Sequence, residues 1–182
     1  MKTLIIHPED PSTKFLKLIY RSLQKITLIT GGASKFEVEE LIRSHDRVMM
    51  LGHGSSAGLF SVGQFNGTNS YIIDNLMVEA LQDKSNSVFI WCNADEFVNK
   101  YLLKGFYSGM FISEVDEADY CGLPGTSQNQ VDESNLRFGE IFSGYANEDT
   151  GSIYKNVLIE YGKLAEKNPV ASYNCKRLYK SQ

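Results

Sequence analysis

Short apolar runs alternate along this chain with segments of helical apolar period, and this alternation most constrains the fold. The runs are brief, largely unalternating and ended by Pro, Gly or polar residues, which is typical of strands buried on both faces. They lie at residues 4–6, 26–29, 48–51, 88–91 and 110–112. Apolar residues recur with helical spacing in the segments between them, near residues 15–23, 36–42, 73–81 and 97–102.

Such strand–helix alternation predicts an α/β fold in which a mostly parallel sheet of five or six strands lies between two helical layers, a three-layer α-β-α sandwich. Ser34 and Glu37 have the spacing of a capping box for the second helix, and Ser12 is expected to cap the first. A chain of 182 residues has the usual length of one domain, so we expect a single domain over residues 1–182.

The remaining segments break the alternation. Residues 52–67 are rich in small residues and contain the pair Asn66-Gly67, so we expect a loop with a short hairpin that forms a wall of the site. Residues 114–133 are predicted to form a long surface loop, and a short helix is expected at 136–142. An amphipathic helix capped by Ser152 is expected at 153–165, and a solvated tail from about residue 170.

The net charge, the first apolar run and the cysteines indicate which partners and which cellular compartment to expect. The net charge of −4 gives no reason to expect a nucleic-acid or membrane partner, because phosphate-rich surfaces attract basic proteins. The first apolar run is far shorter than a signal peptide core, which favours a cytoplasmic protein. The three cysteines are odd in number and form no Cys-x-x-Cys pair, so we expect free thiols, no metal and no cofactor.

In open parallel sheets the ligand site lies outside the carboxyl ends of the strands. Among the residues that directly follow the apolar runs, His53 and Cys92 are the ones that combine a base with a nucleophile. They follow consecutive strands, and consecutive strands are usually neighbours in the sheet. The sequence therefore predicts a cysteine–histidine catalytic dyad.

This pairing suits acyl transfer, because an imidazole can take the thiol proton and later give one to the leaving group. The backbone N–H groups of Gly54 and Cys92 are candidates for an oxyanion hole. Asn93 is expected to cap the next helix, whose dipole lowers a thiol pKa, while Asp95 and Glu96 act in the opposite direction. The alternative is that Cys92 is a core residue, since free cysteines are often buried.

Rival motifs find less support. Residues 54–58 match G-x-S-x-G, but all three histidines lie before Ser56, whereas that family needs a later acid and histidine. A cysteine phosphatase needs an arginine six residues after its cysteine, and Val98 stands there after Cys92. The glycine turn at 30–34 opens a helix and could hold a phosphate, although a capped tight turn is the favoured interpretation.

An apolar strand followed by His-Gly (48–54) and a second followed by Cys (88–92) resemble the caspase-like cysteine peptidases, which include caspases, gingipains, separases and CHAT-type domains. Residues 103–118 are similar to the segment that follows the cysteine in CHAT-type domains, and the likeness extends over roughly residues 3–142. The resemblance implies a caspase-like fold, His53 as general base or acid, Cys92 as nucleophile, an oxyanion hole at Gly54 and Cys92, and a peptide or protein substrate.

The chain departs from the family in its specificity residues. Ile90-Trp91 precedes Cys92 where caspases have Gln-Ala, and Ile90 stands where metacaspases have an aspartate. Glu114, at the end of the fifth expected strand, is a candidate to receive a basic side chain, and an exposed loop carboxylate is the alternative. Three hypotheses follow: a cysteine endopeptidase, a non-catalytic module of the same fold, and, with least support, a small-molecule or phosphate binder.

Overall fold

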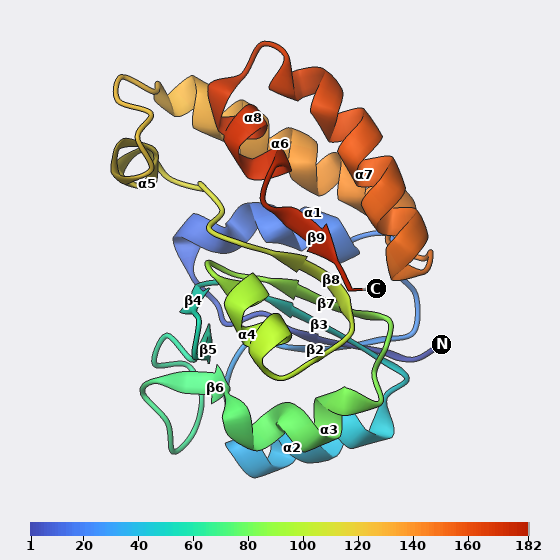
Figure 1. Ribbon diagram of the computed structural model, residues 1–182. Helices are drawn as coiled ribbons and strands as arrows, with labels where there is room; N and C mark the ends of the chain where they lie inside the picture. The colour runs from blue at the N-terminus through green and yellow to red at the C-terminus, as the bar shows by residue number, and fades with distance from the viewer. Residues whose placement is uncertain (182) are drawn as a thin grey trace.

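A computed structural model describes residues 1–181, and its centre is a six-stranded sheet (Figure 1). The strand order is β2-β1-β3-β7-β8-β9; the first five strands are parallel, and β9 runs antiparallel to β8. Helices cover both faces, so the predicted three-layer α/β sandwich with a mostly parallel sheet is confirmed. The strands are β1 (Thr3–Ile6), β2 (Ile26–Ile29), β3 (Arg47–Leu51), β7 (Ser87–Ile90), β8 (Gly105–Ser108) and β9 (Leu178–Lys180).

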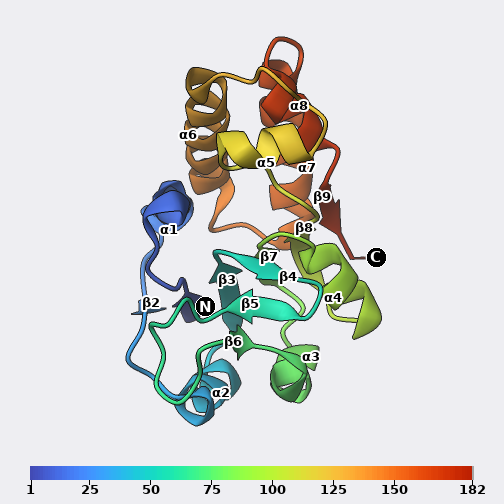
Figure 2. The ribbon, with the colours of Figure 1, turned by 90° about the vertical axis from the view of Figure 1, so that its left-hand side faces the viewer.

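Alternate strand residues belong to two separate hydrophobic cores, one on each face of the sheet. Helices cover both of these faces (Figure 2). Met50 and Phe89 pack against α2 (Lys35–Ser44), α3 (Val78–Gln82) and α4 (Ala94–Lys100). Met49 and Ile90 point the other way, towards α1 (Lys17–Tyr20), α6 (Gln128–Tyr145), α7 (Thr150–Ala165) and α8 (Pro169–Cys175). Burial on both faces explains why the central strands read as continuous apolar runs.

The fifth strand lies earlier than expected, at Gly105–Ser108 rather than at 110–112. All four residues of β8 are buried and pair with β7 and β9. The apolar residues Phe111 and Ile112 are also buried, but they belong to a loop that packs between the sheet and the helices. The apolar run at 110–112 therefore predicted burial correctly, but it does not form a strand.

The segment 114–133 is not a long loop. It holds α5 (Val115–Tyr120) and the first turns of α6, which carries a capping box formed by Ser127 and Gln130. The terminal segment, expected as a solvated tail from about residue 170, instead contains α8 and β9. The helices α5, α6 and α8 bury only narrow stripes of side chains, so their hydrophobic periodicity in the sequence is weak.

Helix caps agree with expectation at one site and differ at others. Ser34 and Glu37 form the predicted capping box of α2. The first helical segment begins as a 3-10 helix, η1 (Pro11–Leu16), whose cap is Asp10 rather than Ser12. Asp149 caps α7, and Ser152 lies in its first turn.

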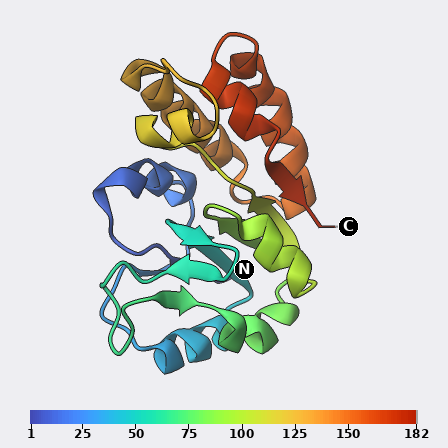
Figure 3. The same cartoon turned by 60° about the vertical axis from the view of Figure 1, so that its left-hand side comes forward.

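The loop after β3 contains the expected hairpin, as part of a small antiparallel sheet (Figure 3). Its strands are β4 (Gly54–Ser55), β5 (Gly58–Phe60) and β6 (Tyr71–Ile73), and a 3-10 turn, η2 (Asn75–Met77), leads into α3. In the view of Figure 3 this small sheet lies beside the blue η1–α1 segment at the carboxyl ends of the main strands. Among residues 1–181, no helix has the length and apolar character that crossing a bilayer requires.

Candidate active site

His53 and Cys92 lie at equivalent positions after two neighbouring strands. Leu51 of β3 pairs with Ile90 of β7, and each site residue follows two positions later. Both side chains line one cavity of about 20 Å³, which is room for about one water molecule. The site adjoins the junction of β1 and β3, where the strand order reverses and α/β sheets usually bind ligands.

The imidazole of His53 is held by two residues that follow β1. Its Nε2 atom lies 2.6 Å from Ser12 Oγ and 3.4 Å from Asp10 Oδ1, and the Ser12 hydroxyl donates to Asp10 Oδ1 over 2.5 Å. A carboxylate only accepts, so the single Ser12 proton goes to Asp10, and Nε2–H of His53 donates to Ser12. This arrangement leaves Nδ1 as the unprotonated nitrogen of the neutral ring.

The Ser12 hydroxyl also lowers the pKa of Asp10 below its usual value, so the carboxylate stays ionised at neutral pH. The sequence pointed to His53 but not to this Asp10–Ser12 pair. Ser12 was expected only as a helix cap, whereas Asp10 caps η1 through the Ser12 N–H at 2.9 Å. The available signal was an Asp-x-Ser triplet just beyond a strand, at the edge of the sheet where the site was expected.

Cys92 is partly buried at the turn between β7 and α4. Its thiol donates to the carbonyl oxygen of Phe111 over 3.7 Å. Burial raises the pKa of the Cys92 thiol to about 11, and the nearby Glu117 carboxylate acts in the same direction. Asn93 begins α4 in the left-handed conformation, and its side chain does not cap the helix. Burial therefore keeps the thiol protonated at neutral pH in this conformation.

Residues 109–114, here called the strap, cross the site between β8 and α5. Ile112 N–H donates to Asn174 Oδ1 (2.8 Å), and Asn174 Nδ2 donates back to the Ile112 carbonyl (2.9 Å). Asn135 Nδ2 donates to the Ser113 carbonyl over 2.9 Å. Across residues 1–181, no hydrogen bond joins the Cys92 thiol to the His53 imidazole. The strap thus supplies the acceptor of the thiol's hydrogen bond and, through Phe111 and Ser113, part of the cavity wall.

Gly54, the expected oxyanion donor, lies in β4 against Trp91. A Cβ at this position would overlap the Trp91 indole and the Gly58 carbonyl, so only glycine fits. Phe60 N–H donates to the His53 carbonyl over 2.8 Å, which makes Gly54 and Leu59 a non-hydrogen-bonded pair. In such a pair the N–H points away from the partner strand. The Gly54 amide is therefore not used in the β4–β5 ladder.

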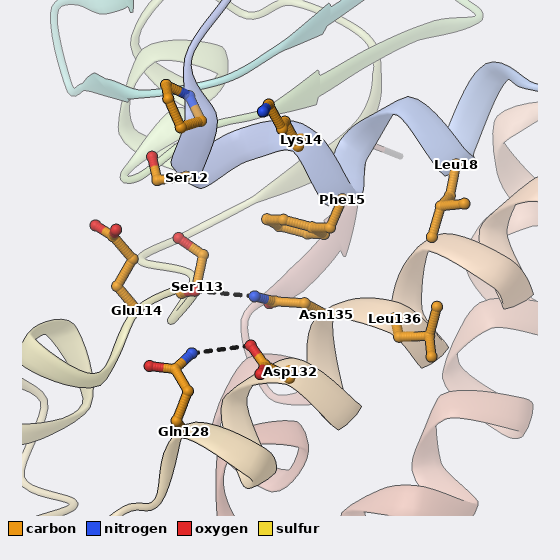
Figure 4. A pocket seen from close by; sticks show the side chains of 11 residues that line it. Ser12, Lys14, Phe15, Leu18, Ser113, Glu114, Gln128, Asp132, Asn135 and Leu136 are labelled. Carbon is orange, nitrogen blue, oxygen red and sulfur yellow. Dashed lines mark hydrogen bonds between the residues drawn. The ribbon is translucent and has the colours of Figure 1, made fainter.

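Glu114 does not line the dyad cavity. It lies in an adjoining groove of about 550 Å³ between η1–α1 and α6 (Figure 4). Phe15 and Ser113 line both the groove and the dyad cavity, so the two spaces are neighbours. The exposed Glu114 carboxylate is thus placed beside the candidate site rather than in it.

The glycine turn at 30–34 uses its amides internally. Gly32 N–H donates to the Gln64 carbonyl (2.7 Å), and Ser34 N–H donates to Glu37 Oε2 (2.8 Å). Both contacts favour a structural turn over a phosphate site. Within residues 1–181, no group of three His, Cys, Asp or Glu side chains is arranged to hold a metal ion.

No protein-family model matches the chain, and searches of curated proteins and of solved structures give no match either. Function is therefore inferred from the geometry of the site and from the motifs in the sequence.

Proposed function

We propose that this protein is a caspase-like cysteine endopeptidase, with Cys92 as nucleophile and His53 as general base. One observation carries the proposal: His53 and Cys92 line the same cavity, and the Asp10–Ser12 pair holds Nε2 of His53 so that Nδ1 is the basic nitrogen. The two sequence motifs of strand-His-Gly and strand-Cys support it. The expected compartment is the cytoplasm, and no cofactor is required.

In the proposed reaction, His53 Nδ1 takes the Cys92 proton, and the thiolate attacks the carbonyl carbon of a peptide bond. The oxyanion accepts hydrogen bonds from the backbone N–H groups of Gly54 and Cys92. The imidazolium then protonates the leaving amine as the C–N bond breaks, which leaves a thioester on Cys92. Water, deprotonated by Nδ1, hydrolyses the thioester and restores the thiol.

The conformation described above is the resting form in this proposal. The thiol is protonated and bonded to Phe111, and the cavity is too small for a peptide. Activity therefore requires the strap to move away from Cys92. Movement would expose the thiol to water and to His53, and both changes lower a thiol pKa.

A panel of peptide acyloxymethylketones with arginine, lysine, leucine or aspartate next to the warhead tests the proposal. We expect one adduct on Cys92 by mass spectrometry, none on Cys92→Ala, and labelling slowed about 100-fold or more in His53→Ala. The Cys121→Ala and Cys175→Ala variants are matched controls and should keep the label. If no probe labels the protein, or if labelling survives Cys92→Ala, the peptidase proposal is wrong.

A second candidate is a non-catalytic module of the same fold. The raised thiol pKa and the Cys92–Phe111 hydrogen bond favour it, because both describe a cysteine that acts as a core residue. Iodoacetamide separates the two: a non-catalytic Cys92 should alkylate with an apparent pKa near 11 whether or not His53 is replaced by alanine. A rate that falls in the His53 variant contradicts the second candidate.

A further inference from the structure

Leu102, in the turn between α4 and β8, combines an exposed apolar side chain with a strained backbone. The residue is 84% exposed and has a φ of 54°, in the left-handed region. Leu102 N–H donates to the Asn99 carbonyl (3.3 Å) and Leu103 N–H to the Val98 carbonyl (2.9 Å), which is the Schellman pattern that ends a helix. Glycine is the usual residue at this position, because a Cβ makes the left-handed conformation unfavourable. Leu102 therefore strains the turn while burying little of its side chain.

A pocket of about 350 Å³, here called the lysine pocket, lies beside this exposed leucine. The buried side chains of Val98, Leu103 and Tyr107 form its apolar floor, and Lys104 and Lys180 also line it. The pocket lies where the end of α4 meets the start of β8 and the end of β9 (Figure 1). This is the amino end of the parallel strands, so the pocket is at the opposite edge of the sheet from the candidate active site.

The lysine pocket is basic, although the chain as a whole is acidic. Its lining holds two lysines and no Asp or Glu, whereas the whole chain has a net charge of −4. A third lysine, Lys100, is exposed on the last turn of α4, with Nζ 5.0 Å from the centre of the Tyr101 ring. Within residues 1–181, neither Lys100, Lys104 nor Lys180 forms a salt bridge. Ammonium groups around an apolar floor favour a ligand that carries both carboxylates and apolar side chains.

We infer that Leu102 and the lysine pocket bind an acidic segment of a partner protein. An apolar residue of that segment packs on Leu102, and neighbouring carboxylates contact Lys104 and Lys180. An apolar anchor inside a charged rim is the usual composition of a protein interface, and strained residues of the Leu102 kind cluster at binding sites. The volume of the pocket suits a few side chains of a short segment. The inference is independent of the peptidase proposal, because it involves neither His53 nor Cys92.

Fluorescence anisotropy with the full chain tests the inference. The probe is a fluorescein-labelled peptide in which the unit Glu-Glu-Leu is repeated, and two comparison peptides replace every glutamate by glutamine or every leucine by serine. We expect the first peptide to bind about tenfold tighter or more than either comparison peptide. Its affinity should fall as the salt concentration rises, because salt screens exposed charges.

Two variants of the lysine pocket should each remove one of these preferences. The double variant Lys104→Gln, Lys180→Gln should lose the preference for glutamate, and Leu102→Gly should lose the preference for leucine. The matched controls are Lys167→Gln, an exposed lysine just after α7, and Ile159→Ser, a 52% exposed isoleucine on α7. Neither control residue lines the pocket, so both controls should bind the peptide as the natural chain does.

Thermal unfolding separates loss of binding from loss of folding. Leu102→Gly should raise the midpoint by about 2–4 °C, because glycine adopts the left-handed conformation without strain. A midpoint that does not rise overturns the inference, since Leu102 would then not strain the turn. Equal binding of the three peptides, no binding, or preferences that survive in the pocket variants also overturn it. Dimers of the natural chain that Leu102→Gly abolishes in analytical ultracentrifugation would identify a second copy as the occupant and overturn it as well.

Discussion

Two histidines follow neighbouring strands at the same edge of the sheet, and their surroundings give them different properties. His7, after β1, is buried, and its ring contacts Tyr20 OH at 3.1 Å and Thr13 Oγ1 at 3.2 Å. Burial lowers the pKa of His7 to about 4. His53, after β3, borders a cavity and is held by a carboxylate–hydroxyl pair. His7 is thus a neutral core residue, and His53 is the candidate base.

His7 should make the protein acid-sensitive. Its pKa is about 4 in the folded protein against an ordinary value of 6.5, so the unfolded chain binds the proton first as the pH falls. Its contribution is therefore complete above about pH 6.5 and is lost as the pH falls towards 4. We expect the free energy of unfolding in urea to drop by about 2 kcal/mol between pH 7 and pH 5 on this account. The drop should shrink in His7→Gln, and an equal drop in that variant contradicts the assignment.

The catalytic role of His53 and Cys92 stays a prediction, but their positions directly after neighbouring strands could be predicted from the sequence, because the apolar runs of those strands are local patterns. Asp10, Asn135 and Asn174 could not, because their roles depend on contacts between segments far apart in the sequence. For the same reason the sequence left the thiol pKa open, while burial under the strap decides its direction.

Among the elements, the strap links Cys92 to the helices of one face. Asn174 of α8 binds both backbone groups of Ile112, and Asn135 of α6 binds Ser113. Central strands and α2 were predictable because their apolar periods and caps are local. The strap was misread as a strand and a loop, because its apolar residues pack on distant helices.

Loosening the strap should expose Cys92. Asn174→Ala leaves the N–H and carbonyl of Ile112 buried without partners, which costs about 2–4 kcal/mol of stability. Alkylation of Cys92 by iodoacetamide, followed by mass spectrometry at neutral pH, should become faster. The matched control is Asn168→Ala, which removes another buried asparagine that caps α8 and bonds Gln130 but does not touch the strap. Equal acceleration in both variants would show general loosening rather than release of the strap.

The first half of the chain carries His53 and Cys92, the proposed dyad, and the second half covers them. The units from β1 to α4 carry Asp10, Ser12, His53 and Cys92, whereas α6 and α8 hold the strap, and α6 forms one wall of the groove. The strap begins where Gly109 N–H donates to the Arg177 carbonyl over 2.8 Å. The order of the βα units could be predicted from the sequence. The return of the last segment to the sheet edge could not be predicted, because three residues of antiparallel pairing leave little periodicity to detect.

The strand β9 that ends this segment should stabilise the sheet. Ending the chain after Arg177 removes buried Leu178 and the Tyr107–Tyr179 ring contact, and it leaves the buried strand β8 as an open edge. We expect a loss of about 2–3 kcal/mol from the leucine alone, measured by urea unfolding, and self-association in size-exclusion chromatography because open apolar edges pair with other chains. Leu178→Ala, which keeps the strand, should show the loss of stability without the self-association. A truncated chain that stays monomeric with unchanged stability would mean that β9 is dispensable to the sheet.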